Sequence, residues 1–168
     1  MDGYRIEKLV FESLPGIHVT ALVYVPEGPS GKRPAVLLAC GHSPVGKAHP
    51  GYQEIAVRLV RRGYVVLCWD PVGQGERSQF WDKARGRSRY NLVCGEHAVL
   101  GNFATIAGTS LVRYMVWDGM RAVDYLLSFD AAPTSSPPAP LNSALLSKRL
   151  QFCCAAQILA ALPDKGLL

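Results

Sequence analysis

The sequence of 168 residues contains no long apolar run and no Cys-x-x-Cys pair. No stretch of about eighteen apolar residues occurs, which excludes a membrane-spanning helix. Residues 1–8 carry charge with no apolar segment behind them, so we predict no signal peptide and expect a cytoplasmic location. None of the five cysteines belongs to a Cys-x-x-Cys pair, the usual signature of structural zinc or thioredoxin-like chemistry. We therefore expect neither a metal nor a cofactor.

Charged residues are also few, at 18% of the chain, and the net charge is only +5. A surplus this thin does not indicate binding to nucleic acid. One segment, residues 77–89, is densely basic, and we interpret it as a solvated loop, with an anionic partner as the less favoured alternative. Apolar residues make up 49% of the chain, which at this length suits one domain with its own core.

Four segments have the patterns of β-strands. Residues 4–11 and 17–25 are β-rich, the second with regular alternation, and turn residues separate them, which predicts a half-buried antiparallel pair. Residues 35–40 and 64–69 are apolar throughout, which is typical of parallel strands buried on both faces. Residues 52–62, between these two strands, have helical spacing. The order of strand, helix and strand predicts a right-handed βαβ unit.

The remaining chain changes character near residue 130. Residues 72–108 form a long polar connection, and residues 110–127 have the apolar stripe of a long helix. We predict that residues 1–130 form one unit. Residues 131–168 form an atypical tail rich in Pro, Ser and Ala, in which residues 144–162 have the spacing of one further helix.

No strand is predicted after the long helix, so the predicted sheet is incomplete. The strand at residues 35–40 would then be an edge with unpaired backbone N–H and C=O groups. It carries no lysine, no proline and no bulge signal, which are the usual protections of an edge. We therefore expect self-association through this strand.

The carboxyl ends of the two apolar strands are where an open α/β sheet binds ligands. Residues 38–43 read Leu-Ala-Cys-Gly-His-Ser, residues 70–78 read Asp-Pro-Val-Gly-Gln-Gly-Glu-Arg-Ser, and residues 108–126 contain nearly all of the long helix. In this order and spacing the three segments resemble the α/β-hydrolase superfamily, in particular its acetyl-xylan-esterase-like and dienelactone-hydrolase-like esterases. The first stands in the position of the family's His-Gly oxyanion loop, although its order here is Gly41-His42. The second matches the Asp-x-x-Gly-x-Gly-x-x-Ser turn, and the third resembles the helix that leads into the nucleophile strand.

The resemblance implies a partial α/β-hydrolase fold, in which N-terminal antiparallel strands are followed by a parallel βαβα arrangement. It implies acyl transfer by a Ser-His-Asp triad on a small ester substrate, without nucleic acid or membrane as partner. The oxyanion loop falls at His42 and Ser43, with the amide N–H of Ser43, or that of His42, as the donor. The implied structural turn contains Asp70, Gly73, Gly75 and Ser78.

The nucleophile of the family is missing from the sequence. A nucleophile elbow needs Gly-x-Ser-x-Gly, because the sharp turn from strand to helix tolerates only small flanking residues, and no serine here has that context. We therefore assign no catalytic residue and expect a truncated carboxylic-ester hydrolase that is inactive alone. Two alternatives stay open. One is a non-catalytic α/β module that binds a partner or a small acyl ligand, and the other is an enzyme with a replacement nucleophile such as Cys94 or Ser110.

Other polar residues have plainer interpretations. Asp70 and Ser78 are predicted to fix a turn through bonds from side chain to backbone rather than to act in catalysis. His97 beside Glu96 could serve as a base, but an exposed pair in a loop is more simply a solvated one. The three tryptophans are interpreted as packing residues: Trp69, Trp81 and Trp117.

Overall fold

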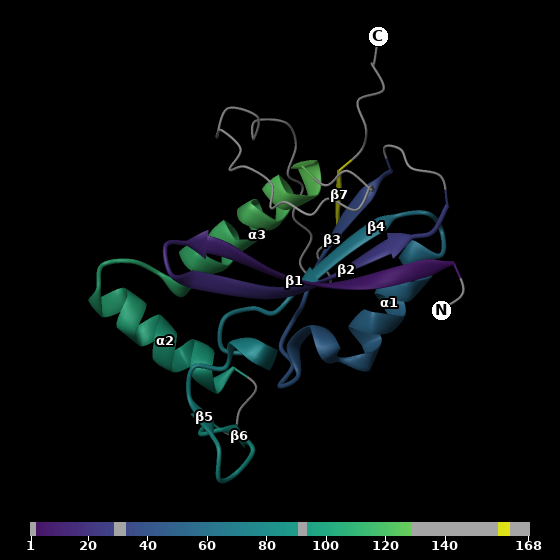
Figure 1. Ribbon diagram of the computed structural model, residues 1–168. Helices are drawn as coiled ribbons and strands as arrows, with labels where there is room; N and C mark the ends of the chain where they lie inside the picture. The colour runs from purple at the N-terminus through teal and green to yellow at the C-terminus, as the bar shows by residue number, and fades with distance from the viewer. Residues whose placement is uncertain (1–2, 29–32, 91–93, 129–157, 162–168) are drawn as a thin grey trace.

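The computed structural model describes residues 3–28, 33–90, 94–128 and 158–161 of the chain. Five strands form one mixed sheet in the order β1-β2-β4-β3-β7 (Figure 1). They are β1 (Tyr4–Leu14), β2 (Ile17–Pro26), β3 (Ala35–Ala39), β4 (Val65–Trp69) and β7 (Ile158–Ala161). β1 pairs with β2 in antiparallel fashion, and β3 pairs with β4 in parallel fashion. Both predicted pairings and the partial α/β fold are therefore confirmed.

Helices cover both faces of the sheet. α3 (Leu111–Ser128) lies on one side and α1 (Pro50–Val60) on the other (Figure 1). Successive residues of a strand point to opposite faces, so Leu37 packs in the cluster with Ala122 of α3, whereas Leu38 packs in the cluster with Val60 of α1. This arrangement explains why the sequence of β3 is apolar at every position.

The ends of α1 follow from local chemistry. The Nδ1 atom of His49 accepts a hydrogen bond from the amide of Gly51 at 3.1 Å, and Pro50 occupies the first helical position, where no N–H partner is needed. Gly63, just beyond the helix, has a φ of +91°, a conformation in which glycine carries no steric cost. The helix predicted over residues 52–62 is confirmed, with both its start and its end two residues earlier.

The long helix α3 also begins at a capping residue. The amide of Arg113 donates to the Ser110 side-chain oxygen at 3.3 Å, as expected of an N-cap serine. The helix predicted over residues 110–127 is confirmed to within one residue at each end. No helix in the described part of the chain is long and apolar enough to cross a membrane.

One helix was not predicted. α2 (Gly95–Ile106) lies within the segment interpreted as a long connection, and its N-cap, Cys94, provides no side-chain bond. Its apolar residues do not form a single stripe, since Phe103 and Ile106 are exposed while Ala104 is buried. A helix without a stripe has no clear periodic signal in the sequence.

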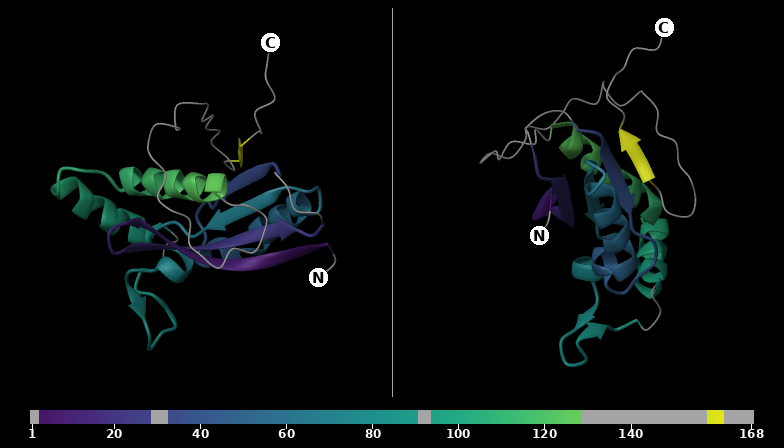
Figure 2. Two further views of the ribbon diagram at one scale, coloured as in Figure 1. Left: turned by 45° about the horizontal axis from the view of Figure 1, so that its top comes forward. Right: turned by 90° about the vertical axis from the view of Figure 1, so that its right-hand side faces the viewer.

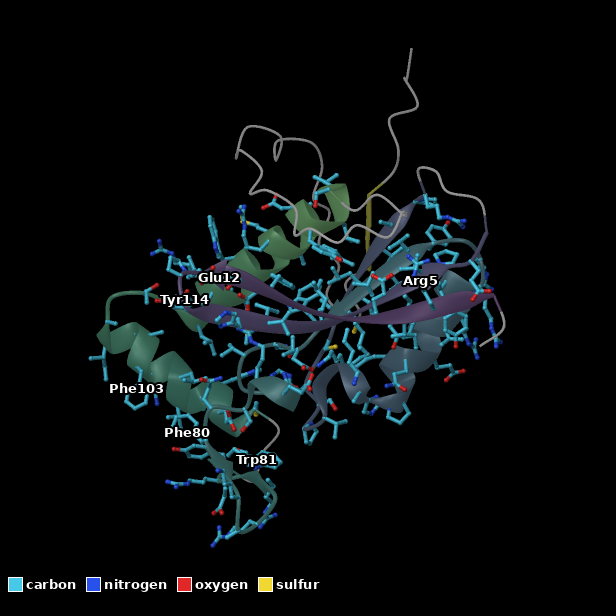
Figure 3. The ribbon with its side chains drawn as sticks, viewed as in Figure 1. Arg5, Glu12, Phe80, Trp81, Phe103 and Tyr114 are labelled. Carbon is cyan, nitrogen blue, oxygen red and sulfur yellow. The ribbon has the colours of Figure 1, made fainter. Side chains whose placement is uncertain are left out.

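The same connection contains a small hairpin of β5 (Trp81–Asp82) and β6 (Arg87–Ser88), which projects away from the main sheet (Figure 3). The rings of Phe80 and Tyr90 meet edge to face beside it, with centroids 5.1 Å apart. Trp81 is 52% exposed, so the interpretation of this tryptophan as a packing residue is wrong. Two single turns of 3-10 helix precede the hairpin: η1 (Gly46–Ala48) and η2 (Gly75–Arg77).

The outer edge of β3 is paired rather than open. β7 runs antiparallel to β3, with Leu37 opposite Leu159 in the register, and lies beside it at the side of the sheet (Figure 2). The expectation of an unpaired edge at residues 35–40 is therefore wrong, because a segment of the tail supplies a backbone ladder that a helix could not. The helix expected over residues 144–162 is also wrong at residues 158–161, and its other positions lie outside the described residues.

This pairing predicts how the tail affects association. A variant that ends at residue 157 should expose the β3 ladder and associate with itself as concentration rises, because an apolar strand without protection adds further strands. Sedimentation velocity of this variant and of the full chain would measure the difference. A variant that ends at residue 161 retains β7 and is the matched control. Equal sedimentation of all three chains would contradict the prediction.

Candidate functional site

The candidate site lies where β3 and β4 end, as the rule for open α/β sheets predicts. The loop after β3 contains His42, Ser43 and Lys47, and the loop after β4 begins at Asp70. A backbone hydrogen bond of 3.2 Å from the Gly75 amide to the Pro44 carbonyl joins the two loops. The two sequence segments that suggested a site are therefore in contact in the structure.

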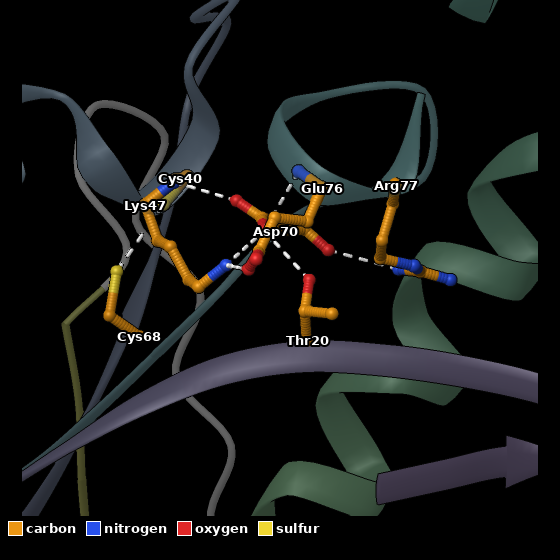
Figure 4. A network of polar contacts seen from close by, with 7 residues as sticks. All are labelled: Thr20, Cys40, Lys47, Cys68, Asp70, Glu76 and Arg77. Carbon is orange, nitrogen blue, oxygen red and sulfur yellow. Dashed lines mark hydrogen bonds and ion pairs between the residues drawn. The ribbon is translucent and has the colours of Figure 1, made fainter. Parts of the chain in front are cut away.

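Asp70 organises both loops from a fully buried position (Figure 4). Its carboxylate accepts hydrogen bonds from the Thr20 hydroxyl at 2.7 Å, from the Lys47 amide at 2.8 Å and from the Glu76 amide at 3.3 Å. The Lys47 ammonium donates both to this carboxylate and to that of Glu76. We refer to Thr20, Lys47, Asp70 and Glu76 as the Asp70 network.

The environment of Lys47 favours its charged form. Burial of the ammonium lowers its pKa, but the hydrogen bonds and charges of Asp70 and Glu76 outweigh this effect, so the pKa is raised above the usual 10.5. Lys47 is only 6% exposed. A buried cation between two carboxylates thus neutralises the charge of Asp70 within the core.

Two glycines allow the loops to approach Asp70 closely. A Cβ atom on Gly46 would lie 2.0 Å from an Asp70 oxygen, and one on Gly75 would lie 2.4 Å from the same oxygen. Both glycines also have positive φ values, of +52° and +54°. Any other residue at either position would displace the carboxylate and strain the backbone.

Arg77 links this region to α3. Its guanidinium donates to the Asp118 carboxylate at 2.7 Å and to the backbone carbonyl of Asp70 at 3.0 Å. Arg77 and Asp118 are 6% and 2% exposed. The interpretation of residues 77–89 as a solvated loop is therefore wrong for Arg77, whose charge is paired inside the protein.

Glu96 connects α2 to the same loop. Its carboxylate accepts hydrogen bonds from the Ser78 hydroxyl and from the Gln79 amide, at 2.5 and 2.7 Å. Glu96 is 2% exposed, so the interpretation of Glu96 and His97 as a solvated pair is wrong. The structure places Ser78 in a bond to α2, so this residue ties the turn to a helix that the sequence did not reveal.

His97 faces His42 across the site. Its Nε2 lies 2.7 Å from the Val72 carbonyl, and its Nδ1 lies 3.2 Å from Nε2 of His42. Because a carbonyl oxygen only accepts, Nε2 of His97 carries a hydrogen, and its Nδ1 accepts a hydrogen bond from Nε2–H of His42 when both rings are neutral. The two facing nitrogens are therefore joined by one hydrogen bond, along which a proton can pass between the rings.

The pKa of His97 is lowered from its usual 6.5. Burial is the main cause and the charge of His42 adds to it, while the bond to Val72 and the nearby Glu96 act in the opposite direction. A lowered pKa leaves His97 neutral, and so able to act as a base, at neutral pH.

Ser43 and His42 occupy different environments in the oxyanion loop that the sequence suggested. The Ser43 amide donates to the side-chain oxygen of Gln74, and both residues are 2% exposed. His42 is exposed, and its ring centroid lies 5.1 Å from that of His97. In this structure the Ser43 amide therefore has an internal acceptor.

Two residues were considered as replacement nucleophiles, Cys94 and Ser110. Neither takes part in the contacts described above. Cys94 is exposed at the start of α2, and the Ser110 hydroxyl oxygen caps α3. Cys40 and Cys68, in contrast, have their sulfur atoms 3.3 Å apart beside the Asp70 network (Figure 4). The hydrogen bond with the Cys40 thiol and burial together raise the pKa of the Cys68 thiol well above its usual value.

Several residues that complete the site were not predicted from the sequence. Lys47 is one lysine in a loop of Gly, Pro and His, and Gln74 lies between two conspicuous glycines. Asp118 lies between apolar residues on α3. This position was a signal that a buried ion pair exists, because a carboxylate on a buried stripe needs a partner. Its partner, Arg77, could not be identified from spacing.

Comparisons with known proteins support the fold. No protein-family model and no curated protein matches the chain. A crystal structure described as that of "a putative acetyl xylan esterase" from Bacteroides fragilis matches with a TM-score of 0.63 and 23% identity. The match covers 78% of this chain but only 36% of that protein. The chain thus has an esterase-like fold and spans about a third of the length of this structural neighbour.

The Asp70 network predicts a large effect on stability. Asp70→Asn should lower the free energy of unfolding by about 3–5 kcal/mol, because it leaves the Lys47 ammonium buried without its closest partner. Urea denaturation at pH 7 would measure the change. Glu54→Gln, which removes an exposed i,i+4 pair with Arg58, is the matched control and should cost about 0.5 kcal/mol or less. Similar effects for the two variants would contradict a central role for Asp70.

The histidine pair predicts a titration. In NMR, His97 should titrate below pH 6.5, and His42→Ala should raise its midpoint, since the substitution removes a neighbouring charge and admits water. His18→Ala, at an exposed position on β2, should leave the midpoint unchanged. The unfolded chain takes up the proton first, so His97 should contribute stability above pH 6.5 that is lost as the pH falls towards its folded-state pKa. A midpoint at or above 6.5 would exclude the arrangement.

Proposed function

We propose that this chain provides the first part of a carboxylic-ester hydrolase of the acetyl-esterase type. The observation that supports this most directly is the position of the loop that contains His42 and Ser43, which the Asp70 network fixes at the carboxyl ends of β3 and β4. The esterase-like fold shared with the Bacteroides fragilis protein supports the same assignment. The specific membership of the α/β-hydrolase superfamily is part of this proposal.

The proposed chemistry needs a backbone N–H directed at the oxyanion of an ester. For the Ser43 amide to fill this role, the Gln74 side chain must rotate away, because its oxygen now accepts that hydrogen. The His42 amide is the alternative donor. Removal of one such donor typically lowers turnover about 10²–10³-fold.

The 168-residue chain should show no enzymatic turnover of activated esters. Loss of the nucleophilic serine costs on the order of 10⁶ in turnover, and the sequence contains no nucleophile elbow. Hydrolysis of p-nitrophenyl acetate should proceed at the same rate with the folded chain as with the chain unfolded in urea. A burst of p-nitrophenolate that Cys94→Ala or Ser110→Ala abolishes would instead establish a replacement nucleophile.

The DNA that encodes the chain provides the test of ester-hydrolase ancestry. When the sequence downstream of codon 130 is read in all three frames, one frame should encode Gly-x-Ser-x-Gly. A protein that joins residues 1–130 to that frame should react with a fluorophosphonate probe at the new serine, whereas the 168-residue chain should not. The absence of an elbow from every frame would contradict the proposal.

The alternative of a non-catalytic module makes a different prediction. Such a module would have no elbow in any frame and no probe labelling, yet would bind a partner or a small acyl ligand as the 168-residue chain. The two proposals therefore differ in the encoding DNA, before any protein is made.

A further inference from the structure

The histidine pair of His42 and His97 has the spacing of two metal ligands. Nδ1 of His97 and Nε2 of His42 are 3.2 Å apart. Two imidazole nitrogens that bind one zinc ion at about 2.0–2.1 Å in tetrahedral geometry lie about 3.3–3.4 Å from each other. The two nitrogens are therefore already at the separation that a shared ion requires. A small rotation of the exposed His42 ring is enough to turn both lone pairs towards one point beside the line that joins them.

A backbone contact holds the His97 ring in the tautomer that a metal ligand needs. Its Nε2–H donates to the Val72 carbonyl at 2.7 Å, which leaves Nδ1 as the nitrogen without a hydrogen. Histidines that bind metal ions almost always donate their other ring N–H to a carboxylate, a backbone carbonyl or water, and this bond fixes the tautomer and the direction of the ring. His97 therefore presents a lone pair towards His42.

The surroundings of the pair admit a cation. His42 is exposed, so an ion has access from solvent, and His97 is only partly buried. Glu96, the residue before His97, contributes a nearby negative charge. Lys47, the cation of the loop that contains His42, is paired with two carboxylates and presents no free positive charge to the site. The pair also lies at the carboxyl ends of β3 and β4, where open α/β sheets bind ligands.

Two protein nitrogens leave the other coordination positions of an ion to water. In the part of the chain that the structure describes, no group of three or more His, Cys, Asp or Glu side chains has the arrangement of a metal site. Imidazole is a preferred ligand of Zn²⁺, Ni²⁺ and Cu²⁺, whereas Mg²⁺ and Ca²⁺ prefer oxygen ligands. The ligand set therefore favours a transition-metal ion.

We propose that Nδ1 of His97 and Nε2 of His42 together bind one divalent transition-metal ion of the Zn²⁺, Ni²⁺ and Cu²⁺ class. When both rings are neutral, the hydrogen on Nε2 of His42 moves through solvent to Nδ1 of the same ring, so that the ion replaces the hydrogen bond between the rings. Spacing along the chain does not reveal the site, because 55 positions separate the two histidines. The site does not depend on the proposed hydrolase function, since it needs neither a nucleophile nor an ester.

Calorimetric titration of the full chain, without an affinity tag, with Zn²⁺ tests the proposal. The chain contains four histidines, so every one can be replaced in turn. His42→Ala and His97→Ala should each weaken binding at least about tenfold, because loss even of an outer-shell partner typically costs 10–100-fold in metal affinity. His18→Ala and His49→Ala remove exposed histidines outside the pair and should leave the affinity unchanged. Mg²⁺ should show no binding to the chain.

Thiols also bind Zn²⁺, so the titrations use a background in which Cys94→Ser, Cys153→Ser and Cys154→Ser remove competing ligands. In NMR of this background, one equivalent of Zn²⁺ should shift the ring C–H resonances of His42 and His97. Zinc should also raise the urea midpoint of the background, since an ion that binds only the folded chain stabilises it, but should not raise that of its His42→Ala variant.

Three results would each overturn the proposal. The first is an unchanged zinc affinity in His42→Ala or His97→Ala. The second is a shift of the ring resonances of His18 or His49 in place of those of the pair. The third is the absence of zinc binding from the background that retains all four histidines.

Discussion

The loops at the candidate site depend on a carboxylate with no exposed surface. Asp70 accepts hydrogen bonds from β2, from the loop after β3 and from its own loop, so one side chain fixes three segments that are far apart in the sequence. The two glycines that surround it provide the necessary space, and Lys47 balances its charge. Removal of any one of these residues leaves a buried charge or a steric clash, which makes the arrangement cooperative.

The polar contacts extend from this carboxylate towards the helices. Arg77 donates a hydrogen bond to Asp118 on α3, and Ser78 donates one to Glu96 on α2. Glu96 in turn is next to His97, whose ring reaches His42 in the loop after β3. The histidine pair and this loop are therefore held by one connected set of polar contacts.

The tail contributes to the fold by a backbone interaction. β7 forms a ladder with β3, and this interaction depends on N–H and C=O groups rather than on a side-chain pattern. The Pro- and Ser-rich composition before it therefore gave no indication of a strand. A structural neighbour of which this chain spans 36% shares the esterase-like fold.

The sequence alone determined the parts of the protein that arise from local patterns. Alternation, continuous apolar runs and helical spacing predicted β1, β2, β3, β4, α1 and α3, because these features act over a few residues. The same patterns placed the site at the ends of β3 and β4. Only the tertiary structure decided that Lys47 faces Asp70, that Arg77 faces Asp118 and that His97 faces His42. These pairs are separated by 23 to 55 positions, and side chains that meet at such distances leave no periodic signal in one sequence.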